Sequence, residues 1–191
     1  MEKDINLSIS LKCRRVLEQN GIHAVLTRET DRSLADPEAS GKKASDLKNR
    51  KEQILSQNPD CAVSIHQNSY PDSAQHGAQV FYQAGNEQSQ RLASLIQAQT
   101  RDLTGEENKR EIKPNSDYYL LRDNPVPTVI AEVCFLSNPS EAGMITDEAI
   151  QAAPARPGRS SFTSACLFLF RLLLSYYYDR YHFTIYLLYI L

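Results

Sequence analysis

Residues 59–71 read P-D-C-A-V-S-I-H-Q-N-S-Y-P, an apolar run that begins after a proline turn and ends in polar residues. Its apolar part, residues 61–66, has the length of a strand that is covered on both faces. A second run of this kind, T-V-I-A-E-V, occupies residues 128–133. Buried strands of this composition are typical of parallel sheets, so the two segments predict buried strands of such a sheet.

Segments with a helical spacing of apolar residues alternate with strand-like segments around these two runs. The alternation predicts an α/β fold, with a twisted, mainly parallel sheet flanked by helices. The predicted helices cover residues 3–20, 44–57 and 86–103, with another beginning after residue 137, and the further strands cover 22–28 and 77–83.

The overall composition is that of an ordinary globular protein. The 191 residues include 21 basic and 23 acidic side chains, a formal net charge of −2, and 41% of them are hydrophobic. This balance excludes a basic nucleic-acid-binding module, and seven Gly and nine Pro are too few for a collagen-like chain. The length predicts one domain with an appendage.

The last part of the chain has a different composition. Residues 154–191 hold four basic and one acidic side chain, and ten of the sixteen aromatic residues follow residue 161. We therefore expect a domain over residues 1–153 and an aromatic, apolar tail over 154–191. Three interpretations of the tail remain open: a coding end read in a shifted frame, a membrane or interfacial segment, and a packed helix. Because the tail has no visible partner in the core, we expect its removal to increase solubility.

Two side chains stand at the ends of the predicted buried strands, where open α/β sheets bind their ligands. Glu132 lies in an apolar run, where a charge is costly unless it has a partner, and this favours a functional role. His66 is equally compatible with a ligand and with a hydrogen-bonded core histidine. Glu2 opens the first predicted helix, and by itself it is explained by the helix dipole.

Seven sequence blocks, taken together and in order, resemble a known family. They are E-K-D-I-N-L, L-T-R-E-T-D, D-L-K-N-R, N-P-D-C-A-V-S-I-H-Q-N-S-Y-P, G-A-Q-V-F-Y, Y-Y-L-L-R and V-P-T-V-I-A-E-V-C-F-L-S-N-P-S-E-A. The set resembles the zinc-dependent N-acetylmuramoyl-L-alanine amidases (amidase type 3), and in particular their germination-specific, spore-cortex branch. The resemblance covers about residues 2–150 and implies a phosphorylase/hydrolase-like amidase fold with Zn²⁺ at the strand ends.

The resemblance also implies roles for single residues. Glu2 matches a zinc ligand that opens the first helix, and His66 matches a zinc ligand that ends a later strand. Glu132 matches the catalytic glutamate of the last core strand. Asn68 matches a position that lines the substrate site, with a loop cap as the alternative. Cys134 stands where the family usually has a small residue, so its thiol either packs as a small side chain or competes for metal.

The reaction implied by the resemblance is hydrolysis of the amide bond between N-acetylmuramic acid and the L-alanine of the stem peptide. A catalytic zinc takes three protein ligands and leaves one position for water. Glu132 would take the proton of that water and pass it to the leaving amine. The substrates would be the glycan strands and stem peptides of peptidoglycan, outside the cytoplasm, in the formation of the muramic lactam of the spore cortex.

One part of the family pattern is expected to be missing. In the family, the first strand and a glycine-rich loop with the first histidine ligand precede the position of Glu2. We therefore expect both of these, and an export signal, to be absent from this chain. Two ligands hold zinc less securely than three, so the alternative function is a pseudo-amidase that binds glycan without cleaving it. The sequence does not identify an accessory protein.

Overall fold

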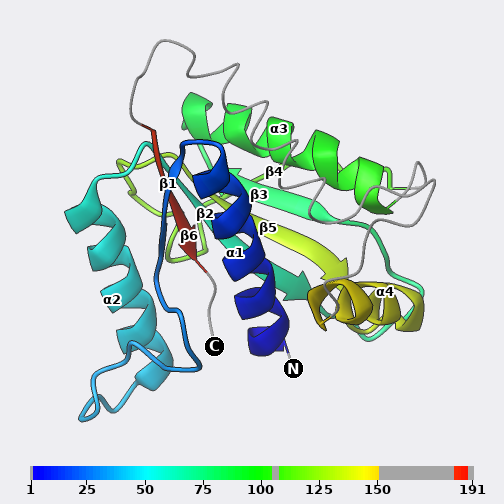
Figure 1. Cartoon of the computed structure of the whole chain (residues 1–191), viewed down its shortest axis with the longest axis horizontal. Helices are drawn as coiled ribbons and strands as arrows, with labels where there is room; N and C mark the ends of the chain where they lie inside the picture. The colour runs from blue at the N-terminus through cyan, green and yellow to red at the C-terminus, as the bar shows by residue number, and fades with distance from the viewer. Residues whose placement is uncertain (1, 105–107, 151–182, 189–191) are drawn as a thin grey trace.

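The computed structural model describes residues 2–104, 108–150 and 183–188, which form helices on both sides of one sheet (Figure 1). The helices are α1 (Glu2–Gln19), α2 (Lys42–Gln57), α3 (Glu87–Thr104) and α4 (Pro139–Ile150). The strands are β1 (His23–Leu26), β2 (Cys61–Asn68), β3 (Gln79–Gln83), β4 (Lys113–Asn115), β5 (Thr128–Phe135) and β6 (Thr184–Leu188).

The strands form a single mixed sheet in the order β1-β6-β2-β5-β3-β4. Neighbouring strands run parallel except for β3 and β5, which are antiparallel. The predicted α/β fold with a mainly parallel sheet is therefore confirmed. The two apolar runs that predicted buried strands are β2 and β5, and they pair with each other.

The two faces of the sheet are covered by different helices. Apolar side chains of α1, α3 and α4 join Val63 and Val129 in the larger core cluster on one face. On the other face, Ile54 of α2 belongs to a smaller cluster with Ala62 and Tyr186. Because apolar clusters lie on both faces, β2 and β5 read in the sequence as nearly continuous apolar runs (Figure 1).

Local sequence signals set the ends of two helices as expected. After α1, Gly21 has a φ of +82°, a left-handed conformation that glycine adopts without strain. Before α4, Asn138 Oδ1 accepts hydrogen bonds from the backbone N–H groups of Ser140 at 3.0 Å and Glu141 at 3.2 Å. This side-chain cap satisfies N–H groups that have no partner within the helix.

The expectation that the tail has no partner in the core is wrong for residues 183–188. β6 lies between β1 and β2 and pairs parallel with both strands. Ile185 and Leu187 point into the larger core cluster, while Tyr186 and Leu188 join the smaller one. A strand that is buried on both faces has no polar alternation, so its apolar sequence was indistinguishable from the rest of the tail.

The other predictions for the tail fall outside the described part of the chain. The domain boundary after residue 153 and residues 154–182 lie there, so the shifted-frame, membrane and helix interpretations of that stretch stay predictions. None of the helices in the described residues is long and apolar enough to cross a membrane.

The short edge strand β4 has no predicted counterpart in the sequence. Its three residues include Pro114, and proline is tolerated only at a sheet edge or a strand end because it donates no hydrogen bond. β4 pairs only with β3 among the described strands, in register from Phe81 opposite Lys113.

Candidate active site

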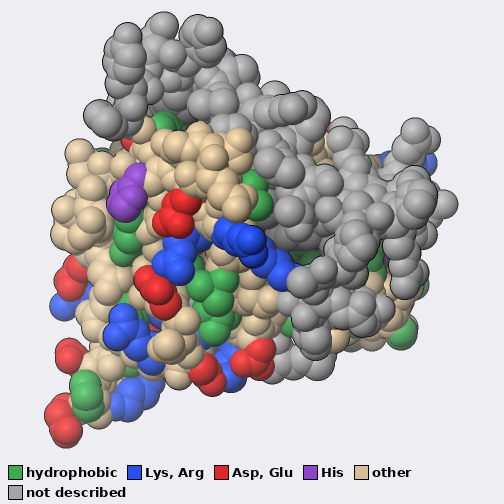
Figure 2. All heavy atoms as spheres, in the orientation of Figure 1, with side chains coloured by type: hydrophobic (Ala, Val, Ile, Leu, Met, Phe, Trp, Pro, Cys, Tyr) green, Lys and Arg blue, Asp and Glu red, His purple; other side chains and the backbone are tan. Residues whose placement is uncertain are grey.

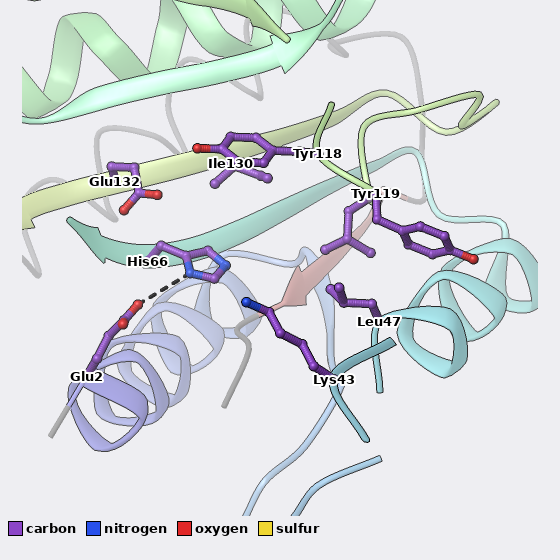
Figure 3. Close-up of a pocket in the computed structure, with 9 residues that line it drawn as sticks. Glu2, Lys43, Leu47, His66, Tyr118, Tyr119, Ile130 and Glu132 are labelled. Atoms are coloured by element: carbon purple, nitrogen blue, oxygen red, sulfur yellow. Dashed lines mark ion pairs between the residues drawn. The ribbon is translucent and has the colours of Figure 1, made fainter. Parts of the chain in front are cut away.

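A pocket of about 260 Å³ opens where β2 and β5 end (Figure 3). The residues that line it include Glu2, His66, Glu132, Lys43, Tyr118 and Tyr119. Figure 3 shows the first three side chains pointing toward one another from α1, β2 and β5. The structure therefore brings together three of the four site residues predicted from the sequence.

The register of the sheet explains why His66 and Glu132 meet. They are direct partners in the parallel β2–β5 pair, and paired residues in adjacent strands point to the same face. The register shifts between His66 and Asn68, so the pairing becomes irregular just beyond the site. Bulges of this kind often re-aim side chains next to active sites.

Glu2 reaches the same place from the first turn of α1. Its Oε1 lies 3.4 Å from Nδ1 of His66 and accepts hydrogen bonds from Asn6 Nδ2 and from the backbone N–H of Gln67, both at 3.2 Å. Burial raises the pKa of Glu2, but the contacts with His66, Gln67 and Asn6 together outweigh it. The pKa of Glu2 is therefore lowered, and the side chain is a carboxylate at neutral pH.

The second ring nitrogen of His66 is also engaged. Nε2 lies 3.0 Å from the hydroxyl oxygen of Ser64, which is completely buried two residues earlier on the same strand. A polar partner on one imidazole nitrogen fixes the orientation of the ring and directs the other nitrogen toward its own partner. Nδ1 is thereby held toward Glu2 (Figure 3).

Glu132 is in a different environment from Glu2. Its Oε2 is buried and has no hydrogen-bond partner in the described part of the chain. Burial raises its pKa, the nearby His66 lowers it and the negative charge of Glu2 raises it, and the net shift is upward. A carboxylate with a raised pKa and an unused oxygen can accept a proton from a bound molecule, which is the property of a general base.

The donor atoms of Glu2 and His66 suit a zinc ion. Two atoms that each lie about 2.1 Å from one tetrahedral zinc are about 3.4 Å apart, and this equals the separation of Oε1 and Nδ1. No group of three or more His, Cys, Asp or Glu side chains within the described residues is arranged to hold a metal. The described residues therefore supply two donors of the right type and spacing.

Asn68 is not among the residues that line the pocket. Its Oδ1 accepts a hydrogen bond of 2.8 Å from the backbone N–H of Ser69, as the loop-cap alternative requires. Its predicted role in substrate binding stays a prediction. The thiol of Cys134 donates to Gln67 Oε1 at 3.0 Å and belongs to the core cluster on the α1 face.

The pocket's other lining residues were not predicted as site residues from the sequence. Tyr118 and Tyr119 come from the Y-Y-L-L-R block, and the ring of Tyr118 packs edge-to-face against Phe81 with centroids 5.4 Å apart. Lys43 lies in the first turn of α2, and its amine points toward His66 (Figure 3). The signal that the sequence offered was the pair of adjacent tyrosines, and both are partly exposed in the structure.

Charged side chains of both signs are mixed on the visible surface. Figure 2 shows acidic and basic side chains interspersed over the described part of one face, with no large patch of a single sign there.

The comparisons with known proteins agree with this geometry. The family model described as N-acetylmuramoyl-L-alanine amidase matches residues 1–157. The germination-specific N-acetylmuramoyl-L-alanine amidase of Bacillus subtilis is 34% identical over 148 residues, which are 76% of this chain and 62% of that protein. The chain thus spans about three fifths of the length of that relative.

Solved structures extend the likeness to the fold. The CwlD amidase of Clostridioides difficile, solved in complex with the GerS lipoprotein, is 39% identical with a TM-score of 0.81, over 92% of this chain and 87% of that one. The catalytic domain of CwlV, from Bacillus (Paenibacillus) polymyxa, is 25% identical with a TM-score of 0.70, over 94% and 87%. With its sheet, its pocket and this matched region, the chain belongs to the N-acetylmuramoyl-L-alanine amidase family.

Proposed function

We propose that this chain hydrolyses the amide bond between N-acetylmuramic acid and the L-alanine of the stem peptide in peptidoglycan. Family membership supports the reaction class. The observation that carries the proposal is the carboxylate of Glu132, whose buried Oε2 has no hydrogen-bond partner in the described residues and lines the same pocket as Glu2 and His66. An unused acceptor beside a two-donor metal half-site is an arrangement suited to amide hydrolysis.

Glu2 and His66 are the residues that would hold zinc. When bound, zinc supplies a Lewis acid for the amide carbonyl and lowers the pKa of water. The 3.4 Å separation of the two donor atoms supports this assignment, as does the contact of His66 with Ser64. The Glu2 side chain is half exposed, so its carboxylate is accessible to a metal ion from the pocket.

Glu132 is the proposed general base. It would take a proton from the attacking water and deliver it to the leaving amine of L-alanine as the carbon–nitrogen bond breaks. Its raised pKa favours this exchange, because a base whose pKa approaches the working pH both accepts and returns the proton. Tyr118 and Tyr119 line the same pocket and would pack against the substrate.

We infer that the substrate is the peptidoglycan of the spore cortex, outside the cytoplasm. This finer assignment rests on the Bacillus subtilis relative, which is named as germination-specific, and on the CwlD amidase. The structure of that amidase with a lipoprotein supports a search for an accessory protein of the same kind for this chain.

Substitution of Glu132 tests the reaction. Glu132→Gln keeps the size of the side chain but removes the proton acceptor, so the rate of hydrolysis of purified peptidoglycan should fall by about 10²–10⁴-fold. The release of free amino groups of L-alanine measures the rate. A variant that hydrolyses peptidoglycan as fast as the unmodified protein would contradict the role of Glu132.

A second candidate is a pseudo-amidase that binds glycan without cleaving it. The observation in its favour is that the described residues supply only two metal donors at the pocket. Zinc content and glycan binding distinguish the two candidates. Binding of peptidoglycan with neither bound zinc nor amide cleavage would favour the second candidate.

A further inference from the structure

A chain of buried polar side chains runs along the α1 face of the sheet and ends at Glu2. The thiol of Cys134 on β5 contacts Gln67 Oε1 on β2 at 3.0 Å, and Gln67 Nε2 donates to Asn6 Oδ1 on α1 at 2.9 Å. Asn6 Nδ2 then donates to Glu2 Oε1 at 3.2 Å. Asn6 and Cys134 are completely buried, and Gln67 is 5% exposed.

The chemistry of its members gives this chain one direction. Burial raises the pKa of the Cys134 thiol to about 12, so the thiol is protonated and donates. A donor at Cys134 selects the oxygen of the Gln67 amide and turns its nitrogen toward Asn6. Because Asn6 accepts from Gln67 through its oxygen, its amide nitrogen is turned toward Glu2. A carboxylate can only accept hydrogen bonds, so Glu2 is the final acceptor of this hydrogen-bond chain.

Gln67 contacts Glu2 in a second way. Its backbone N–H donates to the same Oε1 at 3.2 Å, so the oxygen that faces His66 is held from the helix and from β2 at once. Glu2 is in the first turn of α1, where helices fray, and its side chain is half exposed. Without these bonds its carboxylate could rotate into solvent.

We propose that Cys134, Gln67 and Asn6 are positioning residues, which form a directional hydrogen-bond chain that fixes the Glu2 carboxylate against His66. The inference rests on the proposed function only in taking Glu2 as a metal ligand. The chain also ties the strand of Glu132 to the helix of Glu2, so it sets the position of one site residue relative to the other. Cys134 thus acts as a donor within the protein rather than as a competing metal ligand.

Two buried cysteines provide a matched test. Cys134 and Cys61 are both free, both completely buried and both in the larger core cluster, but only Cys134 contacts Gln67. We expect Asn6→Ala to weaken zinc binding by about 10-fold or more, since direct partners of metal ligands contribute about 10–100-fold to affinity, and Cys134→Ala, which acts through Gln67 and Asn6, to weaken it by more than about threefold. Cys134→Ser keeps the donor and should bind zinc within about threefold of the unmodified protein. Cys61→Ala, the matched control, should also bind zinc nearly as tightly as the unmodified protein.

Competition with a chromophoric chelator measures the zinc affinity of each variant, and circular dichroism reports whether each one is folded. A loss of packing alone would affect Cys61→Ala and Cys134→Ala alike. Equal zinc affinity in these two variants, or no rescue by Cys134→Ser, would overturn the proposal.

A second measurement uses the metal-free protein, so it separates this inference from the proposed function. The side-chain amide protons of Asn6 and Gln67 should exchange slowly in NMR spectra, and they should shift in Cys134→Ala but not in Cys61→Ala. If the unmodified protein binds no zinc and the amide protons still respond in this way, the proposed zinc site is wrong but the hydrogen-bond chain is supported. Amide protons that exchange rapidly, or whose chemical shifts do not change in Cys134→Ala, would contradict the proposed hydrogen-bond chain.

Discussion

At the scale of single residues, Glu132 combines a proposed catalytic role with a cost in stability. Its buried oxygen has no hydrogen-bond partner in the described residues, and its pKa in the folded protein is raised. A carboxyl whose pKa is raised by folding destabilises the folded state once it ionises. The penalty is absent below its ordinary pKa, about 4.3, and is complete at pH values above the raised pKa.

Neutralising Glu132 should therefore stabilise the metal-free protein. We expect Glu132→Gln to increase the free energy of unfolding at pH 7, because a neutral amide replaces a negative charge that burial makes costly. The increase should shrink as the pH falls toward 4, because Glu132 is then protonated in both states. Urea denaturation at a series of pH values measures it, and a Gln variant that is less stable at pH 7 would refute this account of the site.

Glu2 and His66 differ from Glu132 in their expected effect on metal. His66→Ala and Glu2→Gln should each lower zinc affinity by at least about 10-fold and leave the fold intact, because each change removes one donor at the sheet edge. His23→Ala is the control, since His23 is exposed on β1 and does not line the pocket. Equilibrium dialysis gives the affinities, and stoichiometric zinc in His66→Ala would make His66 a purely structural residue.

At the scale of elements, α2 is anchored by a buried ion pair. Arg50 Nε donates to Asp46 Oδ2 at 2.5 Å, and Arg50 Nη1 donates to Thr27 Oγ1 at 2.7 Å. Asp46 Oδ1 also accepts from the backbone N–H of Leu34 at 2.7 Å. The pair thus joins α2 to the end of β1 and to the loop between them. Neither side chain was predicted to be buried, because both are charged and belong to the polar part of the helix sequence.

The pKa of Asp46 gives this anchor a pH dependence. Burial raises that pKa, but the hydrogen bonds from Arg50, Leu34 and Ser33 outweigh it, so the folded value is lowered. The stabilisation is therefore complete above about pH 4, the ordinary range of aspartate, and is lost as the pH falls through the lower folded value. Acid unfolding should reflect the protonation of Asp46.

Asp46→Asn should destabilise the protein by about 3–5 kcal/mol at neutral pH, because it leaves a buried arginine without its carboxylate. The difference from the unmodified protein should narrow below about pH 4. Glu52→Gln is the control, since it removes an exposed ion pair with Lys48 at the same helical spacing, worth about 0.5 kcal/mol or less. Chemical denaturation measures both; equal effects of the two changes would show that the Asp46 pair does not anchor α2.

Elements with a clear period were the predictable part of the fold. The runs that form β2 and β5 and the helical spacing of α1, α2 and α3 identified most of the architecture. His66 and Glu132 were found because a polar residue that ends an apolar strand is conspicuous. The hydrogen-bond chain through Asn6 and Gln67 could not be found in this way, because it depends on pairing between elements that are distant in sequence.

At the scale of the whole molecule, β6 changes the account of the tail. This strand fills a position inside the sheet, and Leu187 is 3% exposed and pairs with Leu26 on one side and Val63 on the other. The composition of residues 154–191 differs from that of the rest of the chain, but composition does not show which apolar segment forms a strand of the sheet. Pairing between residues more than a hundred positions apart decides it.

Leu187→Ala should therefore destabilise the protein by about 2–5 kcal/mol, as expected for a large side chain removed from a core. Leu55→Ala on α2 is the control, since Leu55 is 42% exposed and its loss should cost about 0.5 kcal/mol or less. Thermal and urea unfolding measure both. If Leu187→Ala were as stable as Leu55→Ala, residues 183–188 would not contribute to the core as described.

The central claim is that Glu2, His66 and Glu132 form one metal-dependent site that cleaves the muramoyl–alanine amide bond. The most direct test is mass spectrometry of spore-cortex peptidoglycan that has been incubated with the zinc-loaded protein, with the protein after chelation, and with the protein after zinc is restored. The account predicts stem peptides with a free L-alanine amino terminus and glycan with unsubstituted muramic acid in the first and third samples only. Intact amide bonds in all three samples, or cleavage that persists after chelation, would contradict it.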